Sequence, residues 1–264
     1  MTAPFQHIVV DRAGPVTTVT LSRPEVMNAI NPAMHDELEA AFNAFADEPA
    51  QEICVVTGAG ERAFCAGSDL KAVASSGGHR SYPPHGYAGL IERFDCNKPF
   101  IAAVNGLALG GGFEIALACD IVIAADSASF GLPEPLVGAV ALGGGVHRLA
   151  RQIGLKQAMG MILAARRVDA AEGARLGFVT EVVPTGELKQ ATERWCDQIL
   201  RCSPQALAAS KETVMRGLAE RGIAEAMAAQ GAYPAFAAWR EGEDAREGPL
   251  AFAEKRAPRW HGRA

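Results

Sequence analysis

The sequence predicts an α/β protein, a spiral of repeated strand–strand–helix (ββα) units followed by an all-helical C-terminal region. Two segments, residues 53–71 and 100–119, each contain an apolar strand, a glycine turn and a helix-patterned stretch, and they begin about 47 residues apart. A unit that returns at a fixed spacing indicates stacked supersecondary structures. From about residue 187 onward the apolar residues follow helical periodicity only. We therefore divide the chain into a core over residues 1–186 and a helical region over residues 187–264.

Length and charge restrict the classes of function. The chain has 264 residues, 49% of them hydrophobic, which is enough for one large core with an appendage. Its formal net charge is −5, whereas a surface that binds nucleic acid is expected to be basic. We therefore expect no nucleic-acid partner.

Cysteine usage and apolar runs predict a cytoplasmic protein. The cysteines form no C-x-x-C pair and fit reduced thiols: Cys54, Cys65, Cys96, Cys119, Cys196 and Cys202. The N-terminal stretch MTAPFQHIVVDRAG lacks the basic segment and the apolar run of a signal peptide. Asn105, Glu114 and Asp120 interrupt the most apolar region, which falls short of the ~20 residues of a membrane span. We expect no membrane partner.

The N-terminal segment is predicted to form a β-hairpin and a helix. Residues 8–10 and 16–21 are rich in β-branched side chains, and turn-forming residues separate them. Asn31 followed by Pro32 is typical of an N-cap and a first helical position. Apolar residues then recur at helical spacing to about residue 47: Met34, Leu38, Ala41, Phe42 and Phe45.

The next unit, residues 53–71, combines a short buried strand with the corner AFCAGSDLKA. Gly67 permits an unusual backbone turn there, which would leave the N–H of Ser68 exposed. A serine nucleophile would require a G-x-S-x-G elbow or a motif that places a histidine beside it, and the sequence shows neither. We therefore assign Ser68 a role through its backbone. Residues 75–84, SSGGHRSYPP, are predicted to form a loop, and residues 86–95 a helix.

Residues 98–148 contain the features that point to chemistry. A strand over residues 100–104 is followed by a turn at Asn105-Gly106, and Gly110 to Gly112 stand directly before a helix over residues 113–119. The first N–H groups of a helix have no partner inside it and lie at the positive end of its dipole. This corner is therefore predicted to stabilise negative charge.

Two acidic residues accompany that corner. Glu114 lies in the first turn of the predicted helix, and Glu134 follows a strand over residues 121–125 and the turn Gly131-Leu132-Pro133. Two carboxyl groups with different pKa values can serve one substrate as base and acid. A backbone donor aimed at an oxygen that becomes negative contributes roughly 3–4 kcal/mol. The combination fits addition or removal of water next to a carbonyl, although each acid alone could be a capping residue.

No cofactor or metal site is predicted. The glycine runs do not match G-x-G-x-x-G, because Ile115 or Arg148 stands where the third glycine would be needed. The sequence contains no Walker A motif and no cluster of metal ligands, and His147 is interpreted as a helix-face residue.

The remaining elements are one further strand and a series of helices. A helix is expected over residues 156–165, and Asp169 with Glu172 resembles a capping box for a helix that ends at Gly177. A last strand over residues 178–183 completes the core. Helices are then predicted over residues 188–200, 204–217 with Ser203 as N-cap, 223–240 and 244–255. Such a region has to bury its apolar faces against the core or another subunit.

The segment AVNGLALGGGFEIALACDIVIAADSASFGLPE, followed by GGGVHRLARQIG, resembles the signature of the enoyl-CoA hydratase (crotonase) family. The segment ERAFCAGSDLKA is similar to the other oxyanion segment of that family. The resemblance covers essentially the whole chain and implies a crotonase (ClpP-like) spiral. Within the family, GYAGLIERF and EGPLAFAEKRAPRW are most similar to carnitinyl-CoA dehydratases. Ala141-Leu142 stands where many hydratases carry a proline, and this departure bears on substrate preference.

The resemblance implies a role for each matched residue. It assigns the thioester oxygen to the backbone N–H groups of Ser68 and Gly111, proton transfer at C2 to Glu134, and orientation of water to Glu114. It places coenzyme A (CoA) beside Val26, Met27, Ala66, Gly67, Asp69, Leu70 and Gly110, with Phe252 and Lys255 reaching it from a neighbouring subunit. Without the resemblance, Lys255 would be interpreted as a solvent-facing residue. Tyr82 and Tyr87 are implied to border the acyl pocket, but they fit a solvated loop equally well.

The implied function is that of a lyase, a hydro-lyase of the enoyl-CoA hydratase type in fatty acid β-oxidation. Such an enzyme adds water reversibly and in syn fashion to the 2,3 double bond of a 2-enoyl-CoA, giving a 3-hydroxyacyl-CoA. The alternatives are a carnitinyl-CoA dehydratase that hydrates crotonobetainyl-CoA, an enoyl-CoA isomerase, and a non-catalytic acyl-CoA-binding module. CoA enters as part of the substrate. The implied assembly is a homotrimer, or a hexamer made from two trimers.

Overall fold

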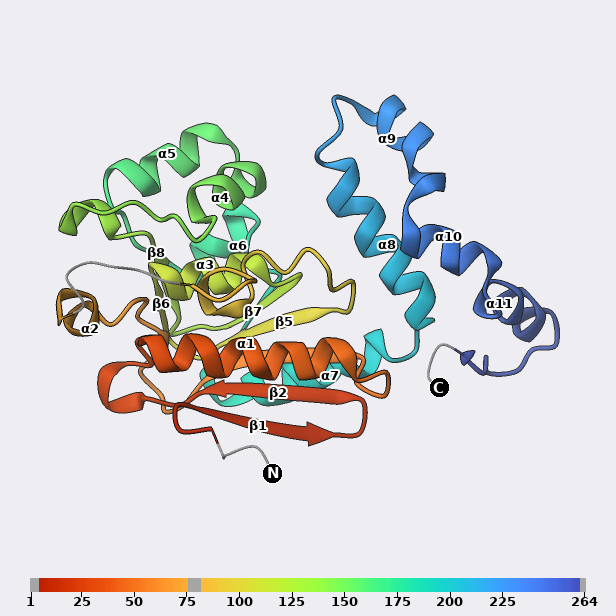
Figure 1. Ribbon diagram of the computed structural model, residues 1–264, viewed down its shortest axis with the longest axis horizontal. Helices are drawn as coiled ribbons and strands as arrows, with labels where there is room; N and C mark the ends of the chain where they lie inside the picture. Colours follow the sequence, from red (N-terminus) through yellow and green to blue (C-terminus); the bar gives the residue numbers. More distant parts are fainter. Residues whose placement is uncertain (1–4, 76–81, 262–264) are drawn as a thin grey trace.

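The strands of the protein form two sheets that lie against each other. The computed structural model describes residues 5–75 and 82–261. The larger sheet has the strand order β1-β2-β3-β5-β7-β10, and the smaller sheet has the order β4-β6-β8-β9. Figure 1 shows most of the chain gathered around these sheets, whereas the last helices extend to one side.

The repeated units build both sheets at once. The first strand of each unit runs parallel to its neighbours in the larger sheet: β3 (Ile53–Gly58), β5 (Phe100–Val104) and β7 (Ile121–Ala125). In the smaller sheet, where β9 adds an antiparallel edge, the second strands of the units pair parallel with one another: β4 (Ala63–Cys65), β6 (Leu107–Leu109) and β8 (Ser129–Gly131). The first two units end in α2 (Leu70–Ser75) and α3 (Gly111–Ala118). The predicted ββα spiral is therefore confirmed.

The N-terminal segment adds a hairpin and a helix to this spiral. Strands β1 (Ile8–Ala13) and β2 (Val16–Leu21) pair antiparallel, and β2 continues the larger sheet parallel to β3. After the short 3-10 helix η1 (Pro24–Val26), α1 (Pro32–Asp47) begins as predicted. The side chain of Asn31 accepts a hydrogen bond from the Met34 N–H at 2.9 Å, and Pro32 occupies the first turn.

A cluster of aromatic side chains fixes the start of α3 on the smaller sheet. The rings of Phe113 on α3, Phe130 on β8 and Phe178 contact one another, with ring centroids 5.0 to 5.4 Å apart. Phe113 and Phe130 are fully buried. Burial of one such side chain stabilises the fold by about 1.5–3 kcal/mol. The N-terminal turn of α3 is therefore held on a rigid base.

The prediction of a helix over residues 86–95 is wrong. The segment contains only a 3-10 turn, η2 (Tyr87–Gly89), and Gly86, Ala88 and Gly89 have φ values of 75°, 58° and 63°. Left-handed backbone of this kind cannot continue a right-handed helix. A Cβ atom on Gly89 would lie 2.6 Å from the Cα atom of Glu39, so the turn packs its main chain directly against α1. This packing outweighs the helical pattern.

Two further predictions need correction in detail. The single helix expected over residues 223–240 is divided into α9 (Ile223–Ala229), η5 (Gln230–Ala232) and α10 (Pro234–Glu241). The break precedes Pro234, because proline lacks an N–H and disfavours helical backbone in the residue before it. Asp169 caps α6 (Ala170–Leu176) by accepting from the Glu172 N–H at 2.7 Å, but the Glu172 carboxylate binds Arg166 rather than completing a capping box.

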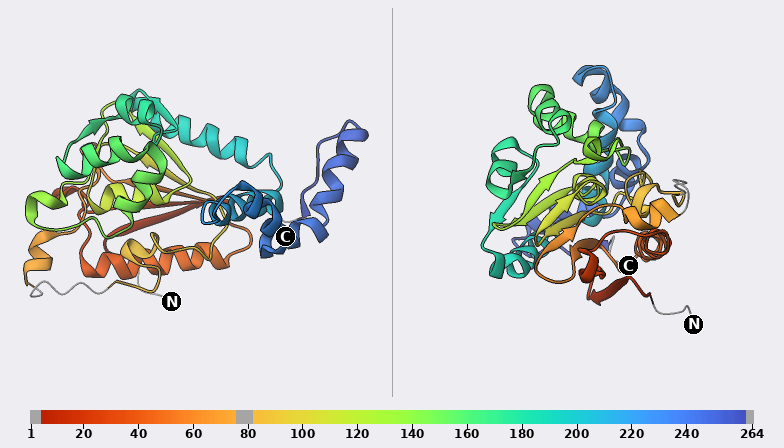
Figure 2. Two further views of the ribbon diagram at one scale, coloured as in Figure 1. Left: turned by 90° about the horizontal axis from the view of Figure 1, so that it is seen from above. Right: turned by 90° about the vertical axis from the view of Figure 1, so that its left-hand side faces the viewer.

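After the repeated units, the next helices pack on the sheets and the last helices project away from them. The elements that complete the core are η3 (Glu134–Val137), α4 (Gly145–Ile153), α5 (Leu155–Leu163), β9 (Val168–Asp169), β10 (Glu181–Val183), η4 (Thr185–Glu187) and α7 (Leu188–Ile199). The elements α8 (Pro204–Gly217), α9, η5, α10 and α11 (Asp244–Ala253) form a projection that we call the C-terminal arm. The left view of Figure 2 shows, from a second viewpoint, the end of the arm standing away from the sheets.

One ion pair anchors the C-terminal arm to the core. The Lys211 ammonium group on α8 binds the Asp120 carboxylate at 2.8 Å and the Lys98 carbonyl at 2.9 Å.

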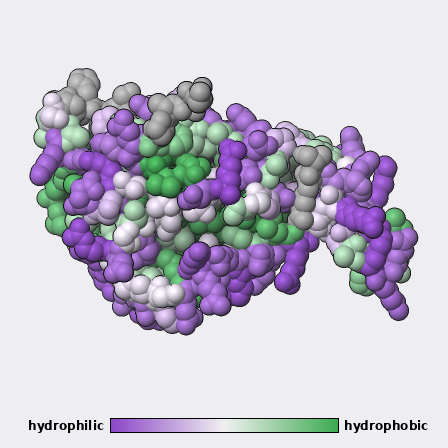
Figure 3. All heavy atoms as spheres, turned by 90° about the horizontal axis from the view of Figure 1, so that it is seen from below, coloured by the Kyte–Doolittle hydropathy of each residue, from purple (hydrophilic) through white to green (hydrophobic). Residues whose placement is uncertain are grey.

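Large hydrophobic side chains are exposed along the arm: Val214, Met215, Leu218, Ile223, Met227, Leu250 and Phe252. Figure 3 shows the arm projecting beside the core, with hydrophobic residues at its surface.

Two expectations concern membranes and the loop before η2. Among the described residues, no helix has both the length and the apolar character needed to cross a bilayer. The predicted loop over residues 75–84 includes residues 76–81, which lie outside the described part of the chain.

Candidate active site

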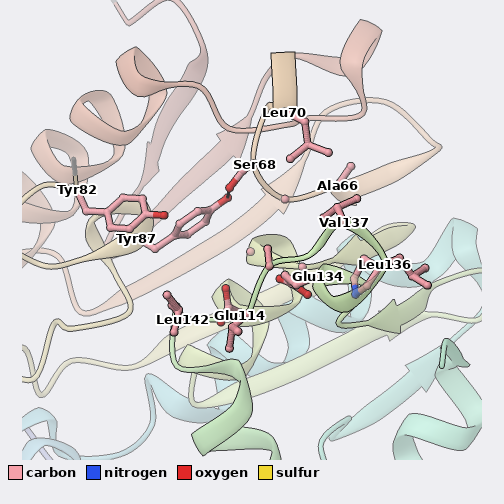
Figure 4. A pocket seen from close by; sticks show the side chains of 17 residues that line it. Ala66, Ser68, Leu70, Tyr82, Tyr87, Glu114, Glu134, Leu136, Val137 and Leu142 are labelled. Carbon is pink, nitrogen blue, oxygen red and sulfur yellow. Dashed lines mark hydrogen bonds between the residues drawn. The ribbon is translucent and has the colours of Figure 1, made fainter. Parts of the chain in front are cut away.

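A pocket of about 200 Å³ opens where the two glycine turns meet. It is lined by Ala66, Gly67, Ser68, Leu70, Tyr82, Tyr87, Gly110, Gly111, Glu114, Pro133, Glu134, Leu136, Val137, Ala139, Val140, Leu142 and Gly143. Figure 4 shows Glu114 and Glu134 on one side of this pocket and Tyr87 and Ser68 on another. The residues come from all three repeated units, so the spiral assembles the pocket.

The turn at Gly67 lies directly against the start of α3. Gly67 has a φ of 89°, and a Cβ atom there would lie 2.8 Å from the Leu109 carbonyl oxygen and 3.1 Å from the Gly111 nitrogen. Only glycine permits this approach without strain. Among the described residues, neither the Ser68 N–H nor the Gly111 N–H donates a hydrogen bond to another main-chain group. Two amides from adjoining turns are thus available at one place.

Glu114 is buried at the wall of this pocket. Its side chain lies on the first turn of α3, only 3% of the residue is exposed, and it accepts a hydrogen bond from the Gly145 N–H at 2.8 Å. Burial raises the pKa of Glu114 to about 7, with a smaller upward contribution from the neighbouring Glu134. The Gly145 and Gly143 amides and Arg148 act in the opposite direction. The carboxyl group can therefore change its protonation state near neutral pH.

Glu134 lines the same pocket beside Glu114. It begins η3 directly after Pro133, and a Cβ atom on Gly110 would lie 2.9 Å from its Oε1 atom. A Cβ atom on Gly143 would lie 2.5 Å from Glu114 Oε2. The two carboxyl groups therefore approach the pocket over glycines that leave room for them. This contact could not be derived from the sequence, although the second glycine run, 143–145, was a visible signal.

The predicted CoA-binding residues fall into two groups. Ala66, Gly67, Leu70 and Gly110 line the pocket. Val26, Met27 and Asp69 do not line the pocket, but they lie beside the turn at Gly67. The Ala66 N–H donates to the Met27 carbonyl at 3.0 Å, and Asp69 pairs with Arg23 at 3.1 Å.

Phe252 and Lys255 are not brought to the pocket of their own chain. Phe252 lies on α11 in the C-terminal arm and is 87% exposed. Lys255 follows the end of α11 with a φ of 54°. Neither residue lines the pocket, and Figure 1 shows α11 at the end of the molecule away from α2 and α3, so a role at CoA would require another subunit.

The mouth of the pocket is apolar. It is lined by exposed side chains from the segment that follows Glu134: Leu136, Val137, Val140 and Leu142. Among the described residues, no group of three or more histidine, cysteine or acidic side chains could hold a metal ion. His147 lies on α4 and does not line the pocket.

Comparison with known proteins places this arrangement in a family. The family model described as enoyl-CoA hydratase/isomerase matches residues 11–263. A carnitinyl-CoA dehydratase from Proteus mirabilis is 42% identical over 261 residues, covering 98% of this chain and 99% of that protein. One from Salmonella arizonae is 43% identical over 254 residues, covering 95% and 97%.

Solved structures agree with the sequence comparison. The crystal structure of an enoyl-CoA hydratase from Mycobacterium tuberculosis matches with a TM-score of 0.89 at 34% identity, covering 97% of this chain and 99% of that chain. A hydratase from Mycobacterium marinum matches with a TM-score of 0.90 at 34% identity and the same coverage. The fold, the length of the match and the identity agree, and the chain therefore belongs to the enoyl-CoA hydratase/isomerase (crotonase) family of enzymes.

Proposed function

We propose that the protein is a hydro-lyase that adds water reversibly to the 2,3 double bond of a 2-enoyl-CoA. One observation carries the proposal: two acidic side chains share a pocket with two adjoining glycine turns whose amides are available. An isomerase can work with one acid, whereas addition of water uses a carboxyl group at each of two carbons. The presence of both Glu114 and Glu134 therefore favours hydration.

The first part of the proposed mechanism is polarisation of the thioester. The carbonyl oxygen accepts hydrogen bonds from the N–H groups of Ser68 and Gly111. These donors withdraw electron density from the conjugated double bond and leave C3 electrophilic. Because they are fixed by the fold, they stabilise the developing oxyanion by roughly 3–4 kcal/mol each. Gly67 permits their close approach.

The second part is the transfer of the elements of water. Glu114 orients a water molecule, whose oxygen bonds to C3 while its proton passes to a carboxylate. The protonated Glu134 carboxyl supplies the proton that bonds to C2. The carboxyl pair thus gives one proton and receives one, and the reverse reaction removes water from a 3-hydroxyacyl-CoA.

An ultraviolet assay of the purified protein against a panel of CoA esters tests this proposal. The panel runs from crotonyl-CoA to long-chain enoyl-CoA and includes crotonobetainyl-CoA. We expect loss of the enoyl absorbance with at least one substrate and formation of the 3-hydroxyacyl product. Binding of the esters without turnover of any would favour the non-catalytic module, and migration of the double bond without hydration would favour the isomerase.

A second candidate is the carnitinyl-CoA dehydratase reaction, in which the acyl group carries a quaternary ammonium. The relatives at 42% identity support it. None of the described residues around the pocket is a lysine or an arginine, whereas two glutamates and two tyrosines line it. Acidic and aromatic side chains attract such cations. A kcat/KM for crotonobetainyl-CoA well above that for crotonyl-CoA would select this candidate.

We further propose that the protein is a homotrimer or a hexamer made from two trimers. The exposed hydrophobic side chains of the C-terminal arm support an association surface. In this assembly Phe252 would contact the CoA of a neighbouring subunit. Lys255 would bind the phosphates of the same CoA. Four expectations from the sequence stay predictions. They are the division of the chain at residue 186, a place in β-oxidation, a cytoplasmic location and the lack of a separate cofactor.

A further inference from the structure

The buried phenol of Tyr87 lies between the two glycine turns. Its oxygen accepts a hydrogen bond from Ser68 Oγ at 3.3 Å, and a Cβ atom on Gly111 would overlap its hydroxyl group. Only 3% of the residue is exposed. Figure 4 shows the Tyr87 hydroxyl group directed toward Ser68. The phenol oxygen therefore contacts both of the residues whose amides are available.

An uncommon backbone conformation holds this ring in place. Ala88 adopts a left-handed conformation with a φ of 58°, which costs a residue with a Cβ atom roughly 1–2 kcal/mol. The Ala88 N–H donates to His35 Nδ1 at 2.9 Å, and Gly89 packs against Glu39 on the same helix. Strain of this kind persists only where the surrounding structure imposes it, and it is concentrated at functional sites.

The His35 side chain of α1, which accepts this hydrogen bond, carries no charge near neutral pH. Burial lowers the pKa of His35 to about 4, so the imidazole is neutral. Its Nδ1 atom accepts from Ala88, which places the ring proton on Nε2. The His35 ring also meets the Tyr87 ring edge-on, with centroids 4.7 Å apart. The direction of the phenol is therefore set by packing and by one neutral hydrogen bond.

The phenol is available as a hydrogen-bond donor. Burial raises the pKa of Tyr87 well above its usual range, so the group keeps its proton and cannot act as a base. Ser68 Oγ donates to the phenol oxygen, which leaves the phenol proton free to point elsewhere. The pocket is the open space beside it.

We propose that Tyr87 is a catalytic residue whose phenol O–H donates a third hydrogen bond to the thioester oxygen, beside the N–H groups of Ser68 and Gly111. This inference deepens the proposed function and rests on it for the identity of the thioester. Ser68 then acts twice, once through its main chain and once through its hydroxyl, which polarises the phenol. Removing one preorganised donor to an oxyanion lowers kcat by roughly 10²-fold.

The test compares Tyr87→Phe with a matched removal of a distant phenol. Tyr233 is buried in the C-terminal arm, beside Arg216, so Tyr233→Phe removes the same hydroxyl group away from the pocket. We expect Tyr87→Phe to lower kcat for hydration roughly 10²-fold with little change in KM, and Tyr233→Phe to leave both unchanged. Phenylalanine keeps the ring, so the fold is retained.

A spectroscopic measurement separates donation from a structural role. Infrared difference spectra of bound butyryl-CoA report the stretching frequency of the thioester carbonyl, and this saturated ester needs no turnover. Fewer hydrogen bonds to the oxygen raise that frequency. We expect an upward shift in Tyr87→Phe and none in Tyr233→Phe.

A double-mutant cycle tests the contribution of the Ser68 hydroxyl. Ser68→Ala keeps the backbone N–H but removes the hydrogen bond to the phenol. It should lower kcat in the wild-type background and have no further effect in Tyr87→Phe. Unchanged kcat and an unchanged carbonyl frequency in Tyr87→Phe would overturn the inference, as would a change in KM alone. An inactive wild-type protein would refute the hydratase proposal, whereas the carbonyl frequency would still decide the role of Tyr87.

Discussion

The Glu114 carboxyl is a buried acid whose ionisation lowers the stability of the folded protein. Because its pKa is about 7 in the folded protein against 4.5 for the ordinary group, folding favours the protonated form. The free energy of unfolding therefore falls as the pH rises from about 4.5 to 7. We predict that Glu114→Gln is inactive but more stable than wild type by about 3 kcal/mol at pH 8.

Urea unfolding at a series of pH values checks this prediction. The advantage of Glu114→Gln should shrink as the pH falls and vanish near pH 4, where the wild-type carboxyl is protonated in both states. An advantage that stays constant from pH 4 to pH 8 would show that it does not come from ionisation of Glu114. Glu193→Gln, on the exposed face of α7, is the control.

Glu134 is assigned the proton at C2, so its loss should remove turnover rather than binding. We predict that Glu134→Gln lowers kcat for hydration at least ~10³-fold while it retains affinity for CoA esters. Stopped assays at high enzyme concentration measure kcat, and calorimetry measures affinity for a saturated ester. Near-native turnover on every enoyl-CoA in the panel would remove the proposed mechanism.

The N-terminal turn of α1 matters for the site because it carries His35. Its cap is a single hydrogen bond, from the Met34 N–H to the Asn31 side chain. We predict that Asn31→Ala lowers the free energy of unfolding by about 1 kcal/mol, whereas Asn31→Asp, which keeps an acceptor, costs less. Chemical denaturation of both variants is the measurement, and equal losses would show that the cap hydrogen bond is not responsible.

The elements differ in how far the sequence could predict them. The start of α1 was predictable, because Asn31-Pro32 is a local signal. The turn η2 was not, because its left-handed backbone is imposed by His35 and Glu39, about 50 residues earlier in the chain. The break before Pro234 had a local signal that the helical periodicity around it obscured.

At the scale of the whole molecule, the spiral was predictable and the completed pocket was not. Two units with the same order of strand, glycine turn and helix were enough to indicate that their corners meet. The sequence also contained Glu114, Glu134 and the glycine turns in recognisable positions. The room that glycines at the start of α4 leave for Glu114 depends on tertiary contacts between distant units. The placement of Tyr87 depends on such contacts as well. Such contacts leave no pattern in a single sequence.

The C-terminal arm stands apart from the pocket of its own chain, and in the proposed trimer this separation would allow two defective chains to complement each other. A Glu134→Gln chain has a sound arm, and a chain with Phe252→Ser and Lys255→Glu has sound acids. If arms serve neighbours, trimers reassembled from a mixture will contain some sites with both functions intact. We predict that the mixture is more active than the sum of the two proteins assayed separately. Strictly additive rates would mean that each polypeptide works alone.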